Sequence, residues 1–390
     1  MRRPVNIGVV LVFTAMLMVG AWVFVQASGQ ESSNGPSPSD SSLVGEDLAF
    51  AADGASMAYC VNSTDRGELW VDVGEGHELV YTGPGVFVYN PVWSPDGAMI
   101  AFAKVAREEG PDGSLSGFLC YVDTSGAAEE TELRVSVNRY EFRHEAIQWS
   151  SDSRRILVCP TPIALWDVKE GRSLVLADIR QDGRKTQMAS LSPSGRQVAF
   201  KEITDDGMEE VLVVDLVTLS TRVVSCVAAT AHWDSPAGPP QWLSESALVF
   251  LAPKDGDKLA LIQYDMSPDS GRELAFPAGH FVVSPDRKTI ACIIVKNDTI
   301  ANALIDVETG SVEDCPGTTG ELMSWSPDNS RLLLYDLGGA RSLNVNSLAL
   351  SPFVTDGSLG WRPAWSPDSK SVVLSLITDG VSKLSTVTVK

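Results

Sequence analysis

The chain has 390 residues, which fits either two average domains or one large repeat architecture. It carries 30 Lys and Arg against 50 Asp and Glu, a formal net charge of -20. Because a field of this sign repels phosphate backbones, the composition excludes nucleic acid as a favoured partner. It is compatible with a cation, a basic protein or simple solubility.

The N-terminal segment predicts export. Arg2 and Arg3 precede an apolar run over residues 7–25. As a helix this run would reach about 28 Å, close to the thickness of the hydrocarbon core of a bilayer. Residues 25–27 (VQA) also offer small side chains to signal peptidase. Residues 1–27 are therefore predicted to be either a cleaved signal peptide or a transmembrane signal anchor, with the rest of the chain outside the cytoplasm, at the cell surface, in a periplasm or secreted.

Residues 28–47 predict a flexible linker. Their sequence, SGQESSNGPSPSDSSLVGED, is rich in Ser, Gly and Pro and nearly devoid of large apolar side chains. Such a composition cannot bury enough surface to form a core. The folded domain is therefore expected to span residues 48–390.

One short pattern recurs throughout residues 48–390. Its clearest form is WSPDGAMIAF at residues 93–102. The spacing between copies is mostly near 42 residues, about the length of one four-stranded propeller blade. Copies 1 to 8 begin, in chain order, at Phe50, Trp93, Trp149, Leu191, Trp242, Val283, Trp325 and Trp365, and copy 5 is one residue short.

The pattern predicts a hairpin turn between two strands. Pro presets φ, Asp bonds local backbone amides, and Gly or Asn accepts positive φ. Three apolar residues follow, as in residues 100–102, so the second strand is expected to be covered on both faces, as stacked blades require. Farther along, a third strand is expected to end in Asp before a turn that contains Gly, as in residues 305–310 (IDVETG).

The combined pattern resembles the TolB-like, WD-repeat-like β-propeller family over residues 48–390. The resemblance implies an all-β fold, and the eight copies imply an eight-bladed β-propeller, with seven blades as the alternative. Propellers of this kind usually borrow an N-terminal strand to complete the last blade. Prolines in residues 35–41 fit a strand ladder badly, so either Leu43 and Val44 pair briefly or the ring closes by side-chain packing alone.

The sequence contains no recognisable catalytic set. Some related propellers carry an added hydrolase domain with a Gly-x-Ser-x-Gly elbow, and no such domain is recognised in this sequence. The chain has four histidines, fewer than a metal-binding lyase with this repeat would carry. His144 and His280 could bind a metal ion together. The simpler interpretation is that both are hydrogen-bonded side chains that fill space on inner strands. The acidic turns at residues 204–209 and 254–258 are interpreted as ordinary hairpin turns and not as calcium sites. The six cysteines are expected to be free thiols. The chain is therefore predicted to be no enzyme and to hold no metal or cofactor.

Loop lengths point to one rim of the disc as the recognition face. The turns that join strands one to two and three to four are uniform, whereas the other loops vary, as at residues 106–117 and 225–241. Variable loops on a rigid scaffold commonly serve recognition. The candidate binding residues near this rim are Tyr140, Phe142, His144, His232, Trp233, Asp234, His280, Trp361 and Arg362.

The predicted function is an extracytoplasmic binding or assembly scaffold, a monomeric propeller that recognises a protein or a cell-envelope polymer. The alternative is an enzyme that acts on a cell-surface polysaccharide, a lyase or glycosidase, for which two or more acids should converge beside a His at the channel mouth. A structural surface-layer component would instead show patches that repeat from blade to blade.

Overall fold

Every regular element in the described part of the chain is a β-strand. The computed structural model describes residues 47–389, apart from 73–75, 110–114, 125–127, 138–146, 160–162, 178–184, 230–237, 257, 321, 337–338, 353–357, 360–362 and 379–380. Among these residues no helix is long and apolar enough to span a bilayer. The helix expected within residues 1–27 and the first 19 residues of the linker expected over 28–47 lie outside the described residues. Its last residue, Asp47, belongs to the folded part, because it is buried and accepts a hydrogen bond from the amide of Asn90 at 2.5 Å.

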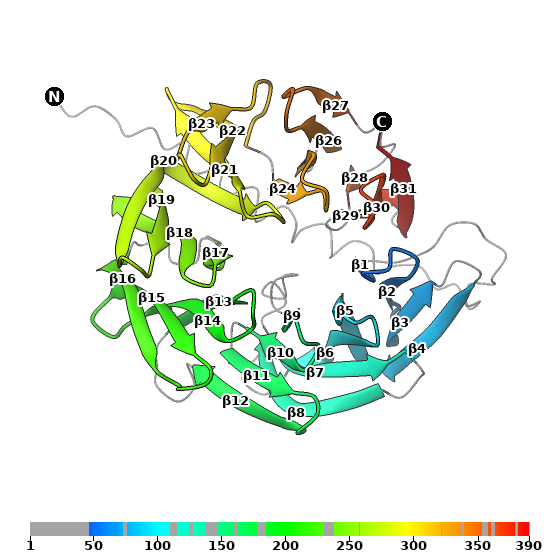
Figure 1. The fold of residues 1–390 in the computed structure, drawn as a ribbon. Helices are drawn as coiled ribbons and strands as arrows, with labels where there is room; N and C mark the ends of the chain where they lie inside the picture. Colours follow the sequence, from blue (N-terminus) through cyan, green and yellow to red (C-terminus); the bar gives the residue numbers. More distant parts are fainter. Residues whose placement is uncertain are drawn as a thin grey trace.

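The strands form sheets that radiate from a central axis (Figure 1). The first two sheets consist of β1 (Leu48–Phe50), β2 (Met57–Asn62), β3 (Arg66–Asp72) and β4 (His77–Pro84), and of β5 (Val86–Trp93), β6 (Met99–Glu109), β7 (Leu115–Asp123) and β8 (Ala128–Val137). The next two consist of β9 (Ile147–Trp149), β10 (Arg155–Val158), β11 (Ile163–Asp167) and β12 (Arg172–Ala177), and of β13 (Lys185–Leu191), β14 (Gln197–Ile203), β15 (Met208–Asp215) and β16 (Thr221–Ala228).

A single seven-stranded sheet follows. It contains β17 (Gln241–Ser244), β18 (Ala247–Asp255), β19 (Lys258–Asp265), β20 (Ser270–Val283), β21 (Thr289–Lys296), β22 (Thr299–Asp306) and β23 (Val312–Asp314). Strand β20 joins two motif copies because its first part pairs with β19 and its last part pairs with β21. Copies 5 and 6 therefore share one continuous sheet, which the sequence analysis did not foresee.

Two more sheets complete the described part. They consist of β24 (Leu322–Trp325), β25 (Arg331–Asp336), β26 (Gly339–Asn344) and β27 (Leu350–Pro352), and of β28 (Ser358–Leu359), β29 (Ala364–Trp365), β30 (Ser371–Thr378) and β31 (Val381–Thr388). In the last sheet, β28 and β29 both pair with the same edge of β30. In the other sheets each strand pairs antiparallel with the next one along the chain.

The motif forms the predicted hairpin turn between the first and second strands. In copy 2, Ser94 Oγ donates to Asp96 Oδ1 at 2.6 Å, and Asp96 Oδ1 accepts from the amide of Ala98 at 3.1 Å. Gly97 has φ 72°, as the turn chemistry predicts. The second strand that follows is buried on both faces, since Ile100 and Phe102 on one face and Ala101 on the other are each 0 % exposed. The prediction of two covered faces is confirmed.

Most third strands end in Asp, as predicted, whereas β26 ends in Asn344. Asp306 ends β22, and its Oδ1 accepts the amide of Thr309 at 2.7 Å. Gly310 then takes φ 73°, which completes the turn into β23. The carboxylate replaces backbone partners that a tight turn leaves unpaired, which explains why Asp recurs at this point.

The tryptophans that open five of the copies join neighbouring parts of the fold. Each indole Nε1 donates to the backbone carbonyl of the residue just before the motif in the preceding copy. Each Trp therefore supplies both buried apolar surface and a directed bond across the interface. The bonds run from Trp93 to Ala49, from Trp149 to Val92, from Trp242 to Ser190, from Trp325 to Val282 and from Trp365 to Ser324, at 2.9 to 3.2 Å.

Two copies that lack Trp are joined by a glutamine instead. Gln148, just before copy 3, donates to Ala189 O at 3.0 Å and accepts from Leu191 N at 3.2 Å. Gln241, just before copy 5, bonds Phe281 O at 3.2 Å and Val283 N at 2.9 Å in the same manner. Copies 4 and 6 therefore receive from the preceding glutamine the polar contact that their Leu and Val cannot make.

The motif turns also contact one another around one rim. The fifth residue of each full-length copy has positive φ. Where this residue is Ser or Asn, its side-chain oxygen accepts a hydrogen bond from the backbone amide of the motif Asp in the preceding copy. The bonds join Asp96 N to Ser153 Oγ, Asp286 N to Asn329 Oδ1 and Asp328 N to Ser369 Oγ, at 3.0 to 3.1 Å.

Side-chain packing joins the first and last sheets. Leu48 and Tyr59 from the first sheet share an apolar cluster with Val373 from the last, and a Cβ placed on Gly54 would lie 3.4 Å from Cβ of Pro367. Among the described residues no strand that precedes β1 adds to the last sheet. Leu43 and Val44, the other route to closure considered above, lie outside the described residues.

Candidate functional site

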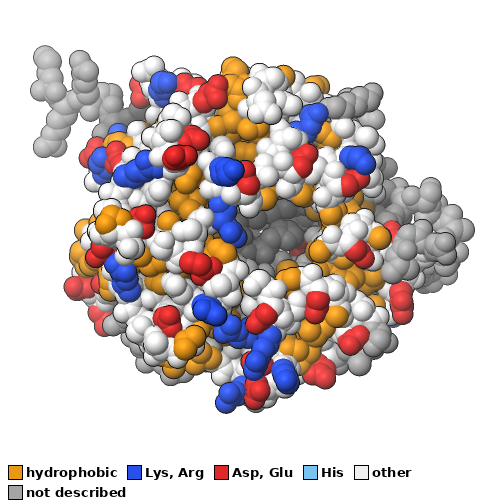
Figure 2. Space-filling model, in the orientation of Figure 1, with side chains coloured by type: hydrophobic (Ala, Val, Ile, Leu, Met, Phe, Trp, Pro, Cys, Tyr) orange, Lys and Arg blue, Asp and Glu red, His pale blue; other side chains and the backbone are white. Residues whose placement is uncertain are grey.

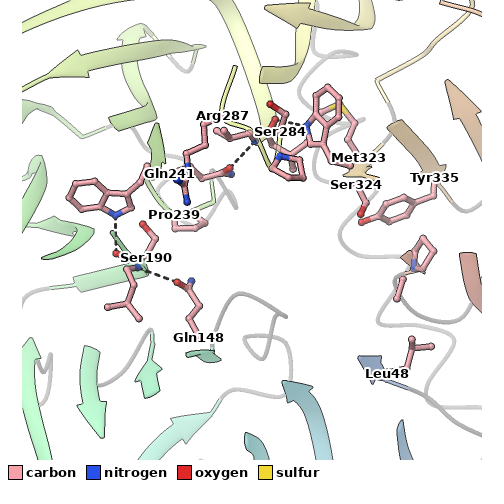
Figure 3. Close-up of a pocket in the computed structure, with 18 residues that line it drawn as sticks. Leu48, Gln148, Ser190, Pro239, Gln241, Ser284, Arg287, Met323, Ser324 and Tyr335 are labelled. Atoms are coloured by element: carbon pink, nitrogen blue, oxygen red, sulfur yellow. Dashed lines mark hydrogen bonds between the residues drawn. The ribbon is translucent and has the colours of Figure 1, made fainter. Parts of the chain in front are cut away.

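A pocket of about 580 Å³ lies at the ring axis, within the usual size of small-molecule sites. Figure 2 shows the central hollow of the space-filling surface, and Figure 3 shows the residues around the pocket. The apolar lining residues are Leu48, Leu191, Pro239, Trp242, Val282, Val283, Pro285, Met323, Trp325, Pro363 and Ala364. The polar ones are Gln148, Ser190, Gln241, Ser284, Arg287, Ser324 and Tyr335.

The pocket is built from inner strands, from segments that lead into two of them and from one motif turn. Gln241 and Trp242 begin β17, Val282 and Val283 end β20, Pro239 and Pro363 precede β17 and β29, and residues 284–287 form the turn of copy 6. Pro239 and Pro363 lie in the same connections between copies as the predicted binding residues at 232–234 and 361–362, so the lining draws on these connections as well as on a motif turn.

Most polar groups of the lining are already engaged within the protein. Gln148 and Gln241 hold the edges of neighbouring inner strands, as described above. Ser190 Oγ donates to the carbonyl of Pro240, and Ser284 Oγ donates to Asp286 Oδ1 at 2.7 Å. These groups fix the shape of the pocket and have little hydrogen-bonding capacity left for a ligand.

Arg287 differs from these residues. It is exposed, lies beside Gln241 and Pro239 (Figure 3), and its guanidinium forms no hydrogen bond or ion pair with any residue that the structure describes. None of the lining residues is Asp, Glu, His or Cys. The described lining therefore carries a positive charge inside a chain whose net charge is -20.

The described residues contain no group of three or more His, Cys, Asp and Glu side chains that could hold a metal ion. The acids beside a His that a polysaccharide-acting enzyme was expected to show are likewise not among the pocket's described lining residues.

Of the predicted binding residues, only His280 lies in the described part. It is partly buried on β20 and is not among the residues that line the axial pocket. The others, which lie outside the described residues, are Tyr140, Phe142, His144, His232, Trp233, Asp234, Trp361 and Arg362.

Sequence reasoning missed Arg287. The signal that could have identified it was its position, because in the other full-length copies this motif position holds Gly, Ser or Asn.

Neither a family model nor a curated protein matches the sequence. Among solved structures, the chain is similar to an oligogalacturonate lyase in complex with manganese, with a TM-score of 0.57 and 13% identity over 89% of this chain and 99% of that one. It is also similar to dipeptidyl peptidase 4 of Porphyromonas gingivalis, with a TM-score of 0.58 and 11% identity over 85% of this chain and 57% of that one. A eukaryotic initiation factor has a TM-score of 0.56 and 13% identity, over 88% and 85% of the two chains.

These likenesses establish the fold at the level of a β-propeller type. At identities of 11% to 13% they carry no information on which residues act. The described lining of the axial pocket does not fit the manganese of the lyase, because it offers no carboxylate, imidazole or thiolate ligand.

The prediction that the chain is no enzyme was wrong. It rested on the lack of a recognisable catalytic motif, whereas the similar solved structures include a lyase and a peptidase. The physical reason is that catalytic groups on a propeller can come from loops far apart in sequence, so they need not form a local motif.

Proposed function

We propose that the protein is an extracytoplasmic enzyme that acts on a cell-envelope polysaccharide bound in the axial pocket. The observation that carries this proposal is the pocket itself, which is preformed, about 580 Å³ in volume, and lined by Trp, Tyr, hydroxyl and guanidinium groups. A mostly apolar lining with aromatic residues, and one guanidinium without a partner among the described residues, suit a sugar ring that carries a polar or charged substituent.

The fold likeness favours a polysaccharide over a peptide as the substrate. The alignment takes in 99% of the lyase chain, so the whole of that protein has a counterpart here. It takes in only 57% of the peptidase chain. A lyase-type or glycosidase-type activity is therefore the better supported of the two chemistries.

We propose further that the ring has eight blades. Each of the eight motif copies places its first residue in a strand near the axis. The seven-stranded sheet would count as two blades that share β20, and the last sheet as the eighth. The N-terminal segment supports an extracytoplasmic address, which cell fractionation with N-terminal sequencing of the product would test.

The function is tested by incubating the full chain with a panel of neutral and acidic cell-surface polysaccharides. Chain shortening is followed by size-exclusion chromatography, and the product ends distinguish a lyase from a glycosidase. We expect at least one polymer to be shortened. Binding without shortening would leave a carbohydrate-binding propeller, and neither binding nor shortening of any polymer would refute the proposal.

A further inference from the structure

Arg287 occupies a backbone conformation that its side chain disfavours. It is the fifth residue of copy 6 and has φ 61°. The left-handed region brings Cβ close to the following carbonyl oxygen, so Gly and Asn are the residues that normally occupy it. The equivalent residues of the other full-length copies are Gly54, Gly97, Ser153, Gly195, Asn329 and Ser369.

The Ser and Asn residues at this position have a visible structural purpose. Ser153, Asn329 and Ser369 each bond the Asp amide of the preceding copy, at 3.0 to 3.1 Å. Arg287 makes no such bond, and its guanidinium has no hydrogen-bonding partner or counter-ion among the described residues. Its backbone amide makes the turn bond to Ser284 O at 2.8 Å, but the cost of its conformation is not offset by any polar contact of its side chain with the described residues.

What Arg287 provides is a positive charge at the pocket. No Asp or Glu is found among the described lining residues, and the carboxylate of the preceding Asp286 accepts from Ser284 Oγ at 2.7 Å. Lys and Arg side chains border the central hollow on one side (Figure 2). A strained residue whose side chain makes no bond to the described residues, held at the edge of a cavity, points to a role in function.

We propose that Arg287 forms an anion subsite of the axial pocket and that the ligand carries a carboxylate or a sulfate ester. The planar guanidinium can receive either group through two parallel hydrogen bonds. This inference rests on the proposed function for the sugar part of the ligand, but not for the anion itself. The protein as a whole repels anions at its net charge of -20, so selection of an acidic ligand depends on this local charge.

The test compares two variants of the full chain. Arg287→Asn keeps a residue that tolerates the left-handed backbone and removes the charge. Lys288→Asn makes the same change in net charge at the next residue, which is exposed and does not line the pocket. The probes are a short uronate oligosaccharide, the same oligosaccharide with methyl-esterified carboxyls, a sulfated oligosaccharide and inorganic sulfate, with affinities measured by calorimetry.

We expect Arg287→Asn to weaken binding of the acidic or sulfated oligosaccharide by about 10- to 100-fold, with the esterified form unaffected. Lys288→Asn should change the affinity for the acidic or sulfated oligosaccharide, and that for the esterified form, by no more than about twofold. The Tm of Arg287→Asn should stay the same or rise by about 1–3 °C, because the strain is relieved. A purely structural role, such as filling the space beside the shortened turn of copy 5, predicts a lower Tm and unchanged affinities.

The outcomes separate this inference from the proposed function. Equal affinity of the wild-type protein for the acidic and esterified oligosaccharides would overturn the anion subsite while leaving a polysaccharide ligand in place. If no oligosaccharide binds but sulfate binding is lost in Arg287→Asn alone, the subsite stands and the proposed function fails. If sulfate and every oligosaccharide bind equally well, or not at all, to the wild type and to Arg287→Asn, the subsite is refuted.

Discussion

Gln241 offers a sharp test of how neighbouring copies are held together, because one side chain bonds two backbone groups of the next inner strand. Its amide donates to Phe281 O at 3.2 Å and accepts from Val283 N at 2.9 Å. Gln241→Val removes both bonds and keeps a residue suited to a strand. Each lost bond costs about 1 kcal/mol, and each backbone group left unpaired away from water costs about 1–3 kcal/mol. We therefore expect a loss of about 2–4 kcal/mol in the free energy of unfolding.

The assay is urea unfolding followed by tryptophan fluorescence and circular dichroism. The matched control is Gln263→Val, because Gln263 is also on a strand but its described side-chain bonds are to the surface residue Arg272. The control should cost less than about 1 kcal/mol. A Gln241→Val protein within about 0.5 kcal/mol of the wild type would refute the reasoning that the glutamine replaces the missing Trp of copy 6.

Two further predictions concern charges. Glu209→Leu should lower the free energy of unfolding by about 3–5 kcal/mol, because it leaves the buried ammonium of Lys201, which lies 3.2 Å from the Glu209 carboxylate, without its counter-ion. The double variant Lys201→Met, Glu209→Leu should recover most of that loss in urea unfolding. A Glu209→Leu protein as stable as the wild type would contradict this. The pKa values of Asp96 and Asp368 are lowered, in each case chiefly because the carboxylate accepts a hydrogen bond from the serine two residues before it. A lowered folded-state pKa contributes stability that is present above the unfolded pKa, about 4, and lost as the pH falls through the folded value. The Tm difference between the wild type and an Asp96→Asn, Asp368→Asn variant should therefore shrink as the pH falls below about 4, and a constant difference would show that the serine bonds do not matter.

The fold could be predicted because its signals are local. The turn chemistry of residues 93–97 depends on backbone conformations that only a few residue types adopt, and the structure has the predicted φ at Gly97. The run of apolar residues after each turn identifies a strand that must be buried on both faces. The merging of copies 5 and 6 through β20 escaped this reasoning, since no local signal tells whether a strand continues into the next sheet.

The site was harder to predict because it depends on contacts between copies. Gln148 and Gln241 appear as ordinary polar residues in the sequence, and their purpose is visible only when Leu191 and Val283 lie beside them. Loop variability directed attention to aromatic residues on the rim opposite the motif turns. The described pocket also includes inner strands and a motif turn, which have the uniform pattern of scaffold and therefore gave no local signal of a site.

A repeat therefore carries its functional information in its exceptions. Where a copy departs from the pattern and a neighbour compensates, as Gln241 does for Val283, the departure is structural and leaves the interface bonded. Where a copy departs, nothing compensates and the residue borders a cavity, the strain suggests a role in function. Arg287 is such a case, because it keeps φ 61° without the bond that Asn329 makes from the same position of the next copy. Its charge is therefore the feature of the axial pocket that is most directly tied to the choice of ligand.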